Sequence, residues 1–178
     1  MTKGTKEKMN SALPELAIKF GGGNIMAAPK LSKVMISSGV GKARDKKKNE
    51  LVSDRLTKII GQKVSARGAK KSIAGFKLRE GEIVGFSATL RGARMFGFLD
   101  KLINVALPRT RDFRGIDAKG IDDMGNFSFG IREHTVFPET ADEDLRDVFG
   151  MGITIVTTAK NKSSARGLLD AIGMPFKK

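Results

Sequence analysis

Apolar residues along the chain recur with two periods, and each period predicts a different kind of element. Spacings of three and four positions place apolar side chains on one face of an α-helix. This spacing predicts four helices, whose apolar positions are Leu13, Leu16, Ala17 and Phe20; Leu51, Val52, Leu56, Ile59 and Ile60; Met95, Phe96, Leu99, Leu102, Ile103 and Ala106; and Leu168, Leu169 and Ile172. Pro14 falls in the first turn of the first helix, Gly61 and Gly173 suit the position that ends a helix, and Pro108 stops the third.

Five strands are predicted, over residues 30–38, 62–69, 82–91, 126–133 and 151–159. Apolar and polar residues alternate in the third and fourth, the first has an apolar centre after Pro29, and the last is rich in Ile, Val and Thr. The clearest is the third, where one face carries Val84, Phe86, Ala88 and Leu90 and the other carries Ile83, Gly85, Ser87 and Thr89. A strand with this alternation buries one face only. The sheet is therefore expected to leave one face open to a ligand.

The mixed order of helices and strands predicts an α+β fold. We expect a mostly antiparallel sheet of about five strands, with helices packed on one face and two long functional loops. A single domain is expected over residues 1–178, with a flexible basic arm over residues 1–10. The two loops, 70–81 and 107–125, are basic and carry phenylalanine, and long loops in compact domains are commonly functional.

The charge of the chain is strongly positive and unevenly distributed. Among 178 residues there are 33 Lys and Arg against 19 Asp and Glu, a formal net charge of +14. Residues 1–89 contain 19 of the basic and 7 of the acidic residues. Such a one-sided excess favours a polyanionic partner, most commonly nucleic acid. An acidic membrane surface is disfavoured, because no basic amphipathic helix with bulky aromatic residues is present.

Composition excludes several classes of protein. No stretch approaches the ~18 consecutive apolar residues of a membrane-spanning helix. No apolar segment follows the polar first residues as it would in a signal peptide. We therefore expect a cytoplasmic protein with no membrane partner. Cysteine is absent, which removes disulfides, thiolate metal sites and thiol catalysis.

No set of residues in the sequence resembles an active site. His134 is the only histidine, and the carboxylates Asp122 and Asp123 lie in a loop with no partner at a characteristic spacing. We predict that the protein is not an enzyme and has no catalytic residue, cofactor or metal site. An acidic cluster is interpreted either as a solvated face or as a docking patch for a basic protein, and it comprises Glu139, Asp142, Glu143, Asp144 and Asp147.

Two short motifs give only weak signals. Gly39-Val40-Gly41 lacks the further residues of a phosphate loop and is interpreted as a tight strand exit, although its backbone amides can still approach an RNA phosphate. The run RMFGFL at 94–99 is similar to an aromatic RNA-binding strand, but its apolar residues fit the stripe of a helix instead.

Basic residues on or beside the predicted strands give the strongest indication of function. They are Lys30, Lys33, Lys63, Arg67, Lys70, Lys71, Lys77, Arg79, Arg91 and Arg94. Arg can bind a phosphate through two parallel hydrogen bonds, and Lys supplies a point charge. Because Tyr and Trp are absent, recognition of the shape and backbone of a folded RNA is favoured over reading of single-stranded bases.

Six runs of residues together carry a resemblance to a known family. The runs are PKLSKVMISSGVG at 29–41, GQKVSARGAKKS at 61–72, SIAGFKLREGE at 72–82, ALPRTRDFRG at 106–115, GNFSFGIREHTVFPE at 125–139 and GITIVTTAKNKSSARGLLDAIGMPF at 152–176. The chain resembles the bacterial 5S-rRNA-binding family that provides the fifth protein of the large ribosomal subunit. The resemblance covers residues 10–178 in one register. Five residues depart from those usual in the family: Ser37, Ile60, Arg67, Phe127 and His134.

The resemblance implies a structural role in translation. Such proteins bind 5S rRNA in the central protuberance beside other ribosomal proteins and help attach it to the large-subunit rRNA. They also contact peptidyl-site tRNA and bridge to the small-subunit head protein thirteen. The 5S rRNA surface is expected to comprise Lys30, Lys33, Ser37, Ser38, Gly39, Gly41, Gln62, Lys63, Ser65, Thr89 and Arg91. The tRNA-contacting loop is expected to present Lys70, Lys71, Phe76, Lys77 and Arg79, and the intersubunit contact Arg109, Arg111 and Arg114.

Two other functions are compatible with parts of the sequence. A small hydrolase on a ferredoxin-like sheet, of the kind that cleaves acyl phosphates, would need an Arg and an Asn around a phosphate, and no local spacing joins such a pair. A free RNA chaperone would share the basic charge but would not sediment with the large subunit.

Overall fold

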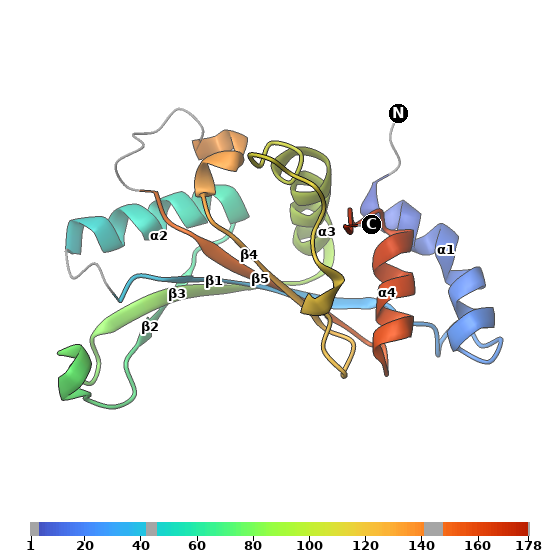
Figure 1. The fold of residues 1–178 in the computed structure, drawn as a ribbon, viewed down its shortest axis with the longest axis horizontal. Helices are drawn as coiled ribbons and strands as arrows, with labels where there is room; N and C mark the ends of the chain where they lie inside the picture. Colours follow the sequence, from blue (N-terminus) through green and yellow to red (C-terminus); the bar gives the residue numbers. More distant parts are fainter. Residues whose placement is uncertain (1–3, 42–45, 141–147, 178) are drawn as a thin grey trace. The chain divides into compact units, whose positions relative to one another are not determined.

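The computed structural model describes residues 4–41, 46–140 and 148–177 (Figure 1). Within them the chain forms four α-helices, α1 (Thr5–Phe20), α2 (Lys46–Ile60), α3 (Gly92–Lys101) and α4 (Lys162–Ala171). It also forms five strands, β1 (Leu31–Gly39), β2 (Ser65–Gly68), β3 (Ile83–Leu90), β4 (Phe127–Ile131) and β5 (Met151–Thr157). The predicted α+β fold is confirmed.

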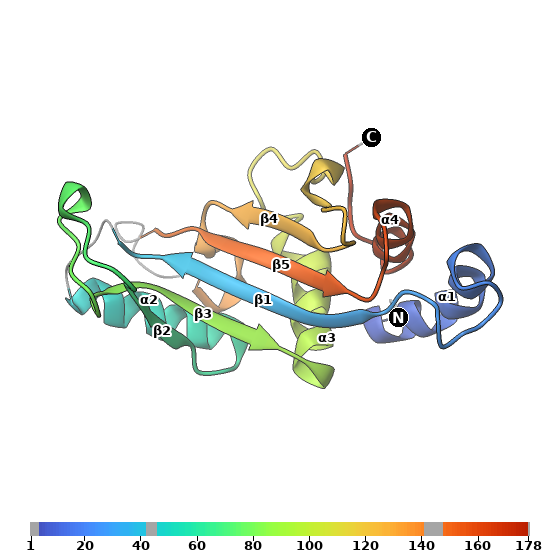
Figure 2. The ribbon, with the colours of Figure 1, turned by 90° about the horizontal axis from the view of Figure 1, so that it is seen from below.

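The strands form an antiparallel sheet in the order β2-β3-β1-β5-β4 (Figure 2). The outermost strand β2 pairs antiparallel with β3, and Ser65 lies opposite Ser87 while Arg67 lies opposite Gly85. The long basic loop over residues 70–81 joins these two strands. The antiparallel character of the sheet follows the prediction.

The chain divides into two compact units. Unit 1 comprises Met1–Met35, Leu90–Phe129 and Ile153–Lys178, and unit 2 comprises Ile36–Thr89 and Gly130–Gly152. In unit 1, α1 packs against α3 and α4, and the fully buried side chains include Leu99, Phe127 and Leu168. In unit 2, α2 contributes the buried Leu56 and Ile59.

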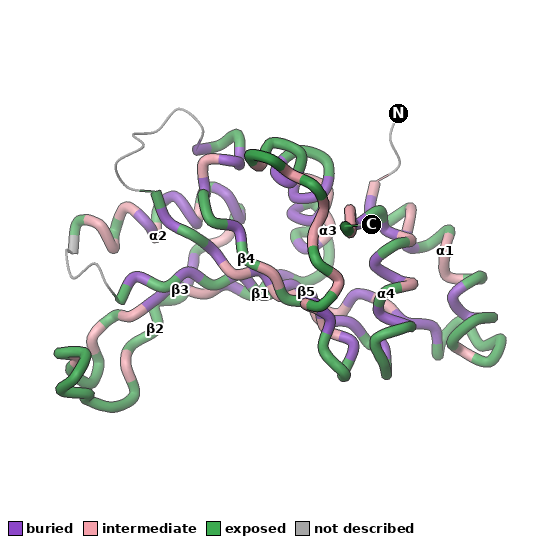
Figure 3. Tube along the Cα trace, in the orientation of Figure 1, coloured by how far each residue is buried: buried purple, intermediate pink, exposed green. Residues whose placement is uncertain are grey.

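Buried residues recur at alternate positions of β1 from Val34 onward and of β3 from Phe86 onward, as the sequence pattern predicts, and Gly85 of β3 is buried as well (Figure 3). In β3, Phe86 and Ala88 are buried and Thr89 is exposed. In β1, Ile36 is buried and Ser37 is exposed. Within unit 2, α2 lies behind the strands in Figure 2, and the opposite side of the strands faces the viewer.

The first helix is longer than its apolar stripe predicts. It begins at Thr5, so residues 5–10 of the expected arm are helical and Pro14 lies inside the helix rather than in its first turn. The backbone N and the Oγ1 of Thr5 both donate hydrogen bonds to Asp100 Oδ1, at 2.6 and 2.5 Å. Met9 is also buried. These contacts are tertiary, which explains why a periodicity in the local sequence does not reveal them.

Two other elements differ in detail from the predictions. The third helical stripe divides into α3 and a π-helical turn over Leu102–Ala106, in which the backbone N of Leu107 donates to the oxygen of Leu102 at 2.9 Å. β2 is shorter than the predicted strand, and all four of its residues are exposed. Among the described residues, no helix is both long and apolar enough to cross a membrane.

Candidate nucleic-acid interface

Within the described residues, the side of unit 2 opposite to α2 carries mostly small and polar residues, together with the exposed Ile83 at the start of β3. We call it the open face and define it by Ser37, Gly39, Gly85, Ser87 and Thr89 at alternate positions of β1 and β3. Ser37, Gly39 and Thr89 are exposed, Ser87 is half-buried and Gly85 is buried. A Cβ on Gly85 would lie 2.8 Å from the backbone oxygen of Ser38, so no side chain fits there. The glycine therefore allows β1 and β3 to lie close together at this point.

Most of the residues predicted for the 5S rRNA surface belong to unit 2. The exposed members there are Ser37, Gly39, Gly41, Lys63, Ser65 and Thr89. The side chain of Gln62 reaches the end of β3, where its Nε2 donates to the oxygen of Thr89 at 3.5 Å. Unit 2 thus brings together residues from β1, β2, β3 and the segment before β2.

The remaining members of this predicted set lie elsewhere. Lys30, Lys33 and Arg91 belong to unit 1, where the two lysines are half-buried and Arg91 is exposed. Ser38 lies in unit 2 but is buried, and its Oγ donates to the oxygen of Gly150 at 2.8 Å. The hydroxyl of Ser38 therefore stabilises the fold on the side of the strand opposite to the open face.

The loop over residues 70–81 has a defined structure and an exposed basic tip. Ile73 and Leu78 exchange two backbone hydrogen bonds, at 3.0 and 3.1 Å, and enclose a short 3-10 helix over Ala74–Phe76. Lys77 follows this helix in the left-handed conformation, with φ of 51°. The exposed residues are the predicted ones, Lys70, Lys71, Phe76, Lys77 and Arg79, and Phe76 is 76% exposed.

The loop over residues 107–125 belongs to unit 1 and exposes Arg109, Arg111 and Arg114, as predicted. Its centre is held by the C-terminal segment, because the backbone of Ile116 receives a hydrogen bond from Lys177 N and donates one to Pro175 O, both at 2.9 Å. The three arginines precede this anchored point.

The end of the same loop is fixed by a carboxylate. Asp122 accepts hydrogen bonds from Asn126, from the backbone N at 2.6 Å and from Nδ2 at 3.0 Å. The side-chain bond and then the backbone bond lower the pKa of Asp122 below its ordinary value. Asp122 therefore has a structural role in a turn. Among the residues described, no cluster of three or more His, Cys, Asp or Glu is arranged to hold a metal ion.

The comparisons with known proteins decide the family. A model described as ribosomal protein L5 matches residues 24–79, and a second model, which describes the C-terminus of the same ribosomal family, matches residues 83–176. The chain is 51% identical over 173 residues to large ribosomal subunit protein uL5 of Desulfatibacillum aliphaticivorans, with 97% of each chain covered. It is 49% identical over 180 residues to the protein of the same name from Ligilactobacillus salivarius, with 100% of each covered.

The chain belongs to the ribosomal protein L5 family. The predicted family resemblance is confirmed over nearly the whole chain. An L5 protein is a structural, non-enzymatic component of the large ribosomal subunit, and it is located in the ribosome, which is cytoplasmic in bacteria.

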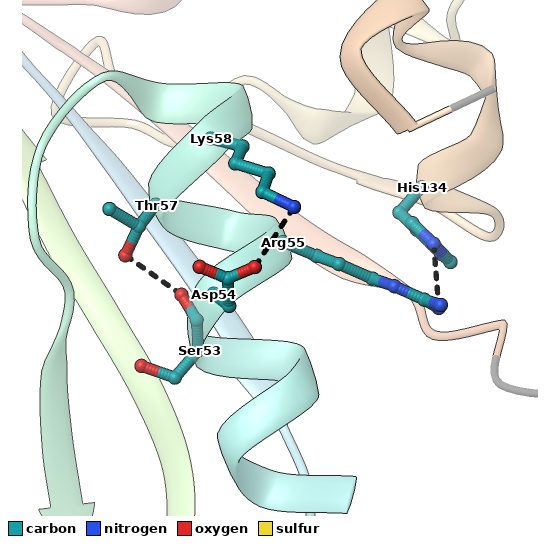
Figure 4. A network of polar contacts seen from close by, with 6 residues as sticks. All are labelled: Ser53, Asp54, Arg55, Thr57, Lys58 and His134. Carbon is teal, nitrogen blue, oxygen red and sulfur yellow. Dashed lines mark hydrogen bonds and ion pairs between the residues drawn. The ribbon is translucent and has the colours of Figure 1, made fainter. Parts of the chain in front are cut away.

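One polar contact of this L5 protein is not predicted by the sequence. His134 is fully buried, stacks on Phe149 with ring centroids 4.1 Å apart, and has its Nε2 3.3 Å from Nη1 of the buried Arg55 (Figure 4). The backbone N of Phe149 donates to its Nδ1 at 3.4 Å. The only local signal is Arg55 itself, which lies between the apolar positions Val52 and Leu56 of its helix. His134 therefore belongs to the core.

The predicted acidic cluster lies mostly outside the described residues. Asp142, Glu143, Asp144 and Asp147 fall in the segment 141–147, and only Glu139 is described, as an exposed residue in a 3-10 helix over Pro138–Thr140. Its two interpretations, a solvated face and a docking patch for a basic protein, both stay predictions.

Proposed function

We propose that this L5 protein binds 5S rRNA in the central protuberance of the large subunit, helps attach it to the large-subunit rRNA, and contacts peptidyl-site tRNA and the small-subunit head. Among these proposed functions, RNA binding is supported most strongly, and the supporting observation is the open face of unit 2. Its strand positions carry mostly small and polar residues, and exposed polar and basic residues lie on and beside it in a chain of net charge +14.

The open face suits the backbone of a folded RNA. Exposed hydroxyls of Ser37, Ser65 and Thr89 can bond to phosphates and 2′-hydroxyls. Lys63, two residues before β2, adds an exposed positive charge. Phosphate contacts set the position and orientation of the RNA, and the absence of Tyr and Trp leaves little surface for base stacking. In unit 1, the predicted contacts are Lys30, Lys33 and Arg91.

The two basic loops are proposed to reach other partners. The loop over residues 70–81 presents three exposed lysines, Arg79 and the exposed ring of Phe76, a combination that suits the phosphates and bases of peptidyl-site tRNA. The loop over residues 107–125 exposes Arg109, Arg111 and Arg114 and is proposed to contact the small-subunit head protein thirteen.

A binding titration tests the proposal. The full chain is titrated against 5S rRNA at about 50 and 200 mM salt, with transfer RNA and random duplex RNA as competitors. We expect 5S rRNA to compete much better than either, and affinity to fall steeply with salt because phosphate contacts release counterions. Equal competition by all three RNAs would contradict specific 5S rRNA binding.

A further inference from the structure

The outermost strand of the sheet carries an arginine whose side chain is fixed in place. Arg67 Nε donates a hydrogen bond to Ser87 Oγ at 2.6 Å. In the pairing of β2 with β3, Arg67 lies opposite Gly85, and Ser87 lies opposite Ser65. The arginine side chain therefore reaches diagonally from β2 to β3, and all four residues belong to unit 2.

Arg67 lies on the open face. Residues directly opposite one another in an antiparallel pair project from the same side of the sheet. Arg67 thus shares its side with Gly85 and Ser87, whereas Phe86 and Ala88 point to the buried side. Gly85 has no side chain to crowd the stem of Arg67, and Arg67 itself is exposed.

The guanidinium of Arg67 is fixed in position, but no carboxylate among the described residues neutralises its charge. Its hydrogen-bond partner among the described residues is the neutral hydroxyl of Ser87, and none of the carboxylates in that part of the chain forms an ion pair with it. The bond to Ser87 occupies Nε only. Both terminal nitrogens of the guanidinium remain available as donors, and this planar group matches two oxygens of one phosphate.

We propose that Arg67 binds a phosphodiester of ribosomal RNA at the open face, and that Ser87 is a positioning residue for its guanidinium. This inference rests on the proposed RNA-binding function and adds a specific phosphate contact to it. Fixing the side chain before binding reduces the conformational entropy that a long, flexible side chain loses on contact with RNA.

The alternative is that the bond between Arg67 and Ser87 only fastens β2 to β3. The two roles differ in their dependence on salt. A phosphate contact releases about one counterion, so its removal lowers the slope of log K against log salt by about one unit, whereas loss of a strand fastener changes stability and leaves that slope unchanged.

The test compares Arg67→Ala with a control variant that also removes one positive charge but lies elsewhere in unit 2. Lys58→Ala is the control, because Lys58 lies on α2 of the same unit, away from the open face, in an ion pair with Asp54 at 3.0 Å. Each full-length variant is titrated at several salt concentrations against 5S rRNA and, separately, against large-subunit rRNA transcribed without 5S rRNA. The RNA for which the slope changes identifies the source of the phosphate.

We expect Arg67→Ala to bind one of the two RNAs about tenfold more weakly, with a slope reduced by about one unit, and Lys58→Ala to stay within about twofold of the wild type. Ser87→Ala keeps the charge, so it should bind about two- to threefold more weakly with an unchanged slope. The double variant Arg67→Ala with Ser87→Ala should match Arg67→Ala, because Ser87 acts through Arg67.

Two results would overturn the inference while the proposed function stands. One is a wild type that binds RNA and an Arg67→Ala variant with the same affinity and slope for both RNAs. The other is weaker binding by Arg67→Ala with an unchanged slope and a lowered unfolding midpoint in urea, which indicates the fastening role. Failure of the wild type itself to bind either RNA would overturn the proposed function and this inference together.

Discussion

At the scale of single residues, two glycines of the open face make opposite predictions. A Cβ on Gly85 would lie 2.8 Å from a backbone oxygen of β1, whereas a Cβ on Gly39 would meet no atom within 4 Å. We expect Gly85→Ala to lower the free energy of unfolding by about 1–3 kcal/mol, because the strands must move apart. Gly39→Ala should change it by less than about 0.5 kcal/mol. Unfolding in urea measures both, and equal effects would contradict the close approach at Gly85.

The buried ring of His134 makes a second prediction at this scale. Its removal in His134→Ala leaves a cavity beside Phe149 and takes away the contact with Arg55, so we expect a loss of about 2–4 kcal/mol in the free energy of unfolding. Glu133→Ala is the control, because the neighbouring Glu133 is exposed and should change stability by less than about 0.5 kcal/mol. A mild effect of His134→Ala would show that its ring is not part of the core.

Residue contacts of this kind are where sequence reasoning reaches its limit. Arg55 and His134 are 79 positions apart, and the sequence around each of them does not predict that they are in contact. Likewise, the 5S rRNA surface expected from the family resemblance includes Ser38, although its hydroxyl is bonded to the oxygen of Gly150 on the buried side. The contact between Arg55 and His134 depends on how distant segments meet, which periodicity does not encode. For Ser38 the alternation of β1 does carry the signal, because it places this residue on the same face as the buried Val34 and Ile36.

At the scale of elements, the loop over residues 70–81 is expected to act separately from the open face. Lys77→Ala combined with Arg79→Ala removes two charges from its tip. This double variant should lower the affinity for peptidyl-site tRNA about threefold or more, while the affinity for 5S rRNA stays within about twofold of the wild type. The rate of tRNA release from ribosomes carrying the variant measures the first effect, and titration measures the second. Lys19→Ala with Lys160→Ala is the charge-matched control, because both lysines are exposed and neither belongs to a proposed contact surface. Loss of 5S rRNA binding in the loop variant would contradict this division of roles.

The elements themselves were largely predictable. The stripe over 51–60 and Gly61 locate α2 and its end, and Gly61 has the positive φ of 72° that ends a helix. The alternation in 82–91 assigns the two faces of β3 correctly. The start of α1 and the π-helical turn after α3 could not be predicted, because the first depends on a hydrogen bond to Asp100 and the second on a shift of backbone bonding inside a continuous apolar stripe.

At the scale of the whole molecule, the basic charge predicts how the protein associates with the ribosome. We expect it to sediment with the large subunit in cell extracts at low salt and to be released progressively by washes of increasing salt, because phosphate contacts weaken as salt rises. Sedimentation on sucrose gradients measures this distribution. A protein found mainly in the free fractions at low salt would instead behave as an RNA chaperone. A neutral, exposed substitution such as Ser11→Ala should leave the distribution unchanged.

The complete exposure of β2 has a consequence for how such a protein can change. All four of its residues are exposed, so new side chains at Ser65 or Ala66 cost the folded state little, whereas a Cβ on Gly68 would lie 3.2 Å from the backbone oxygen of Gly81. Mutations at these positions can therefore raise or lower the affinity for ribosomal RNA while the stability of the fold is retained. We expect adaptation of the ribosome to new ionic conditions to use substitutions in this outermost strand, because they change RNA binding with little effect on folding.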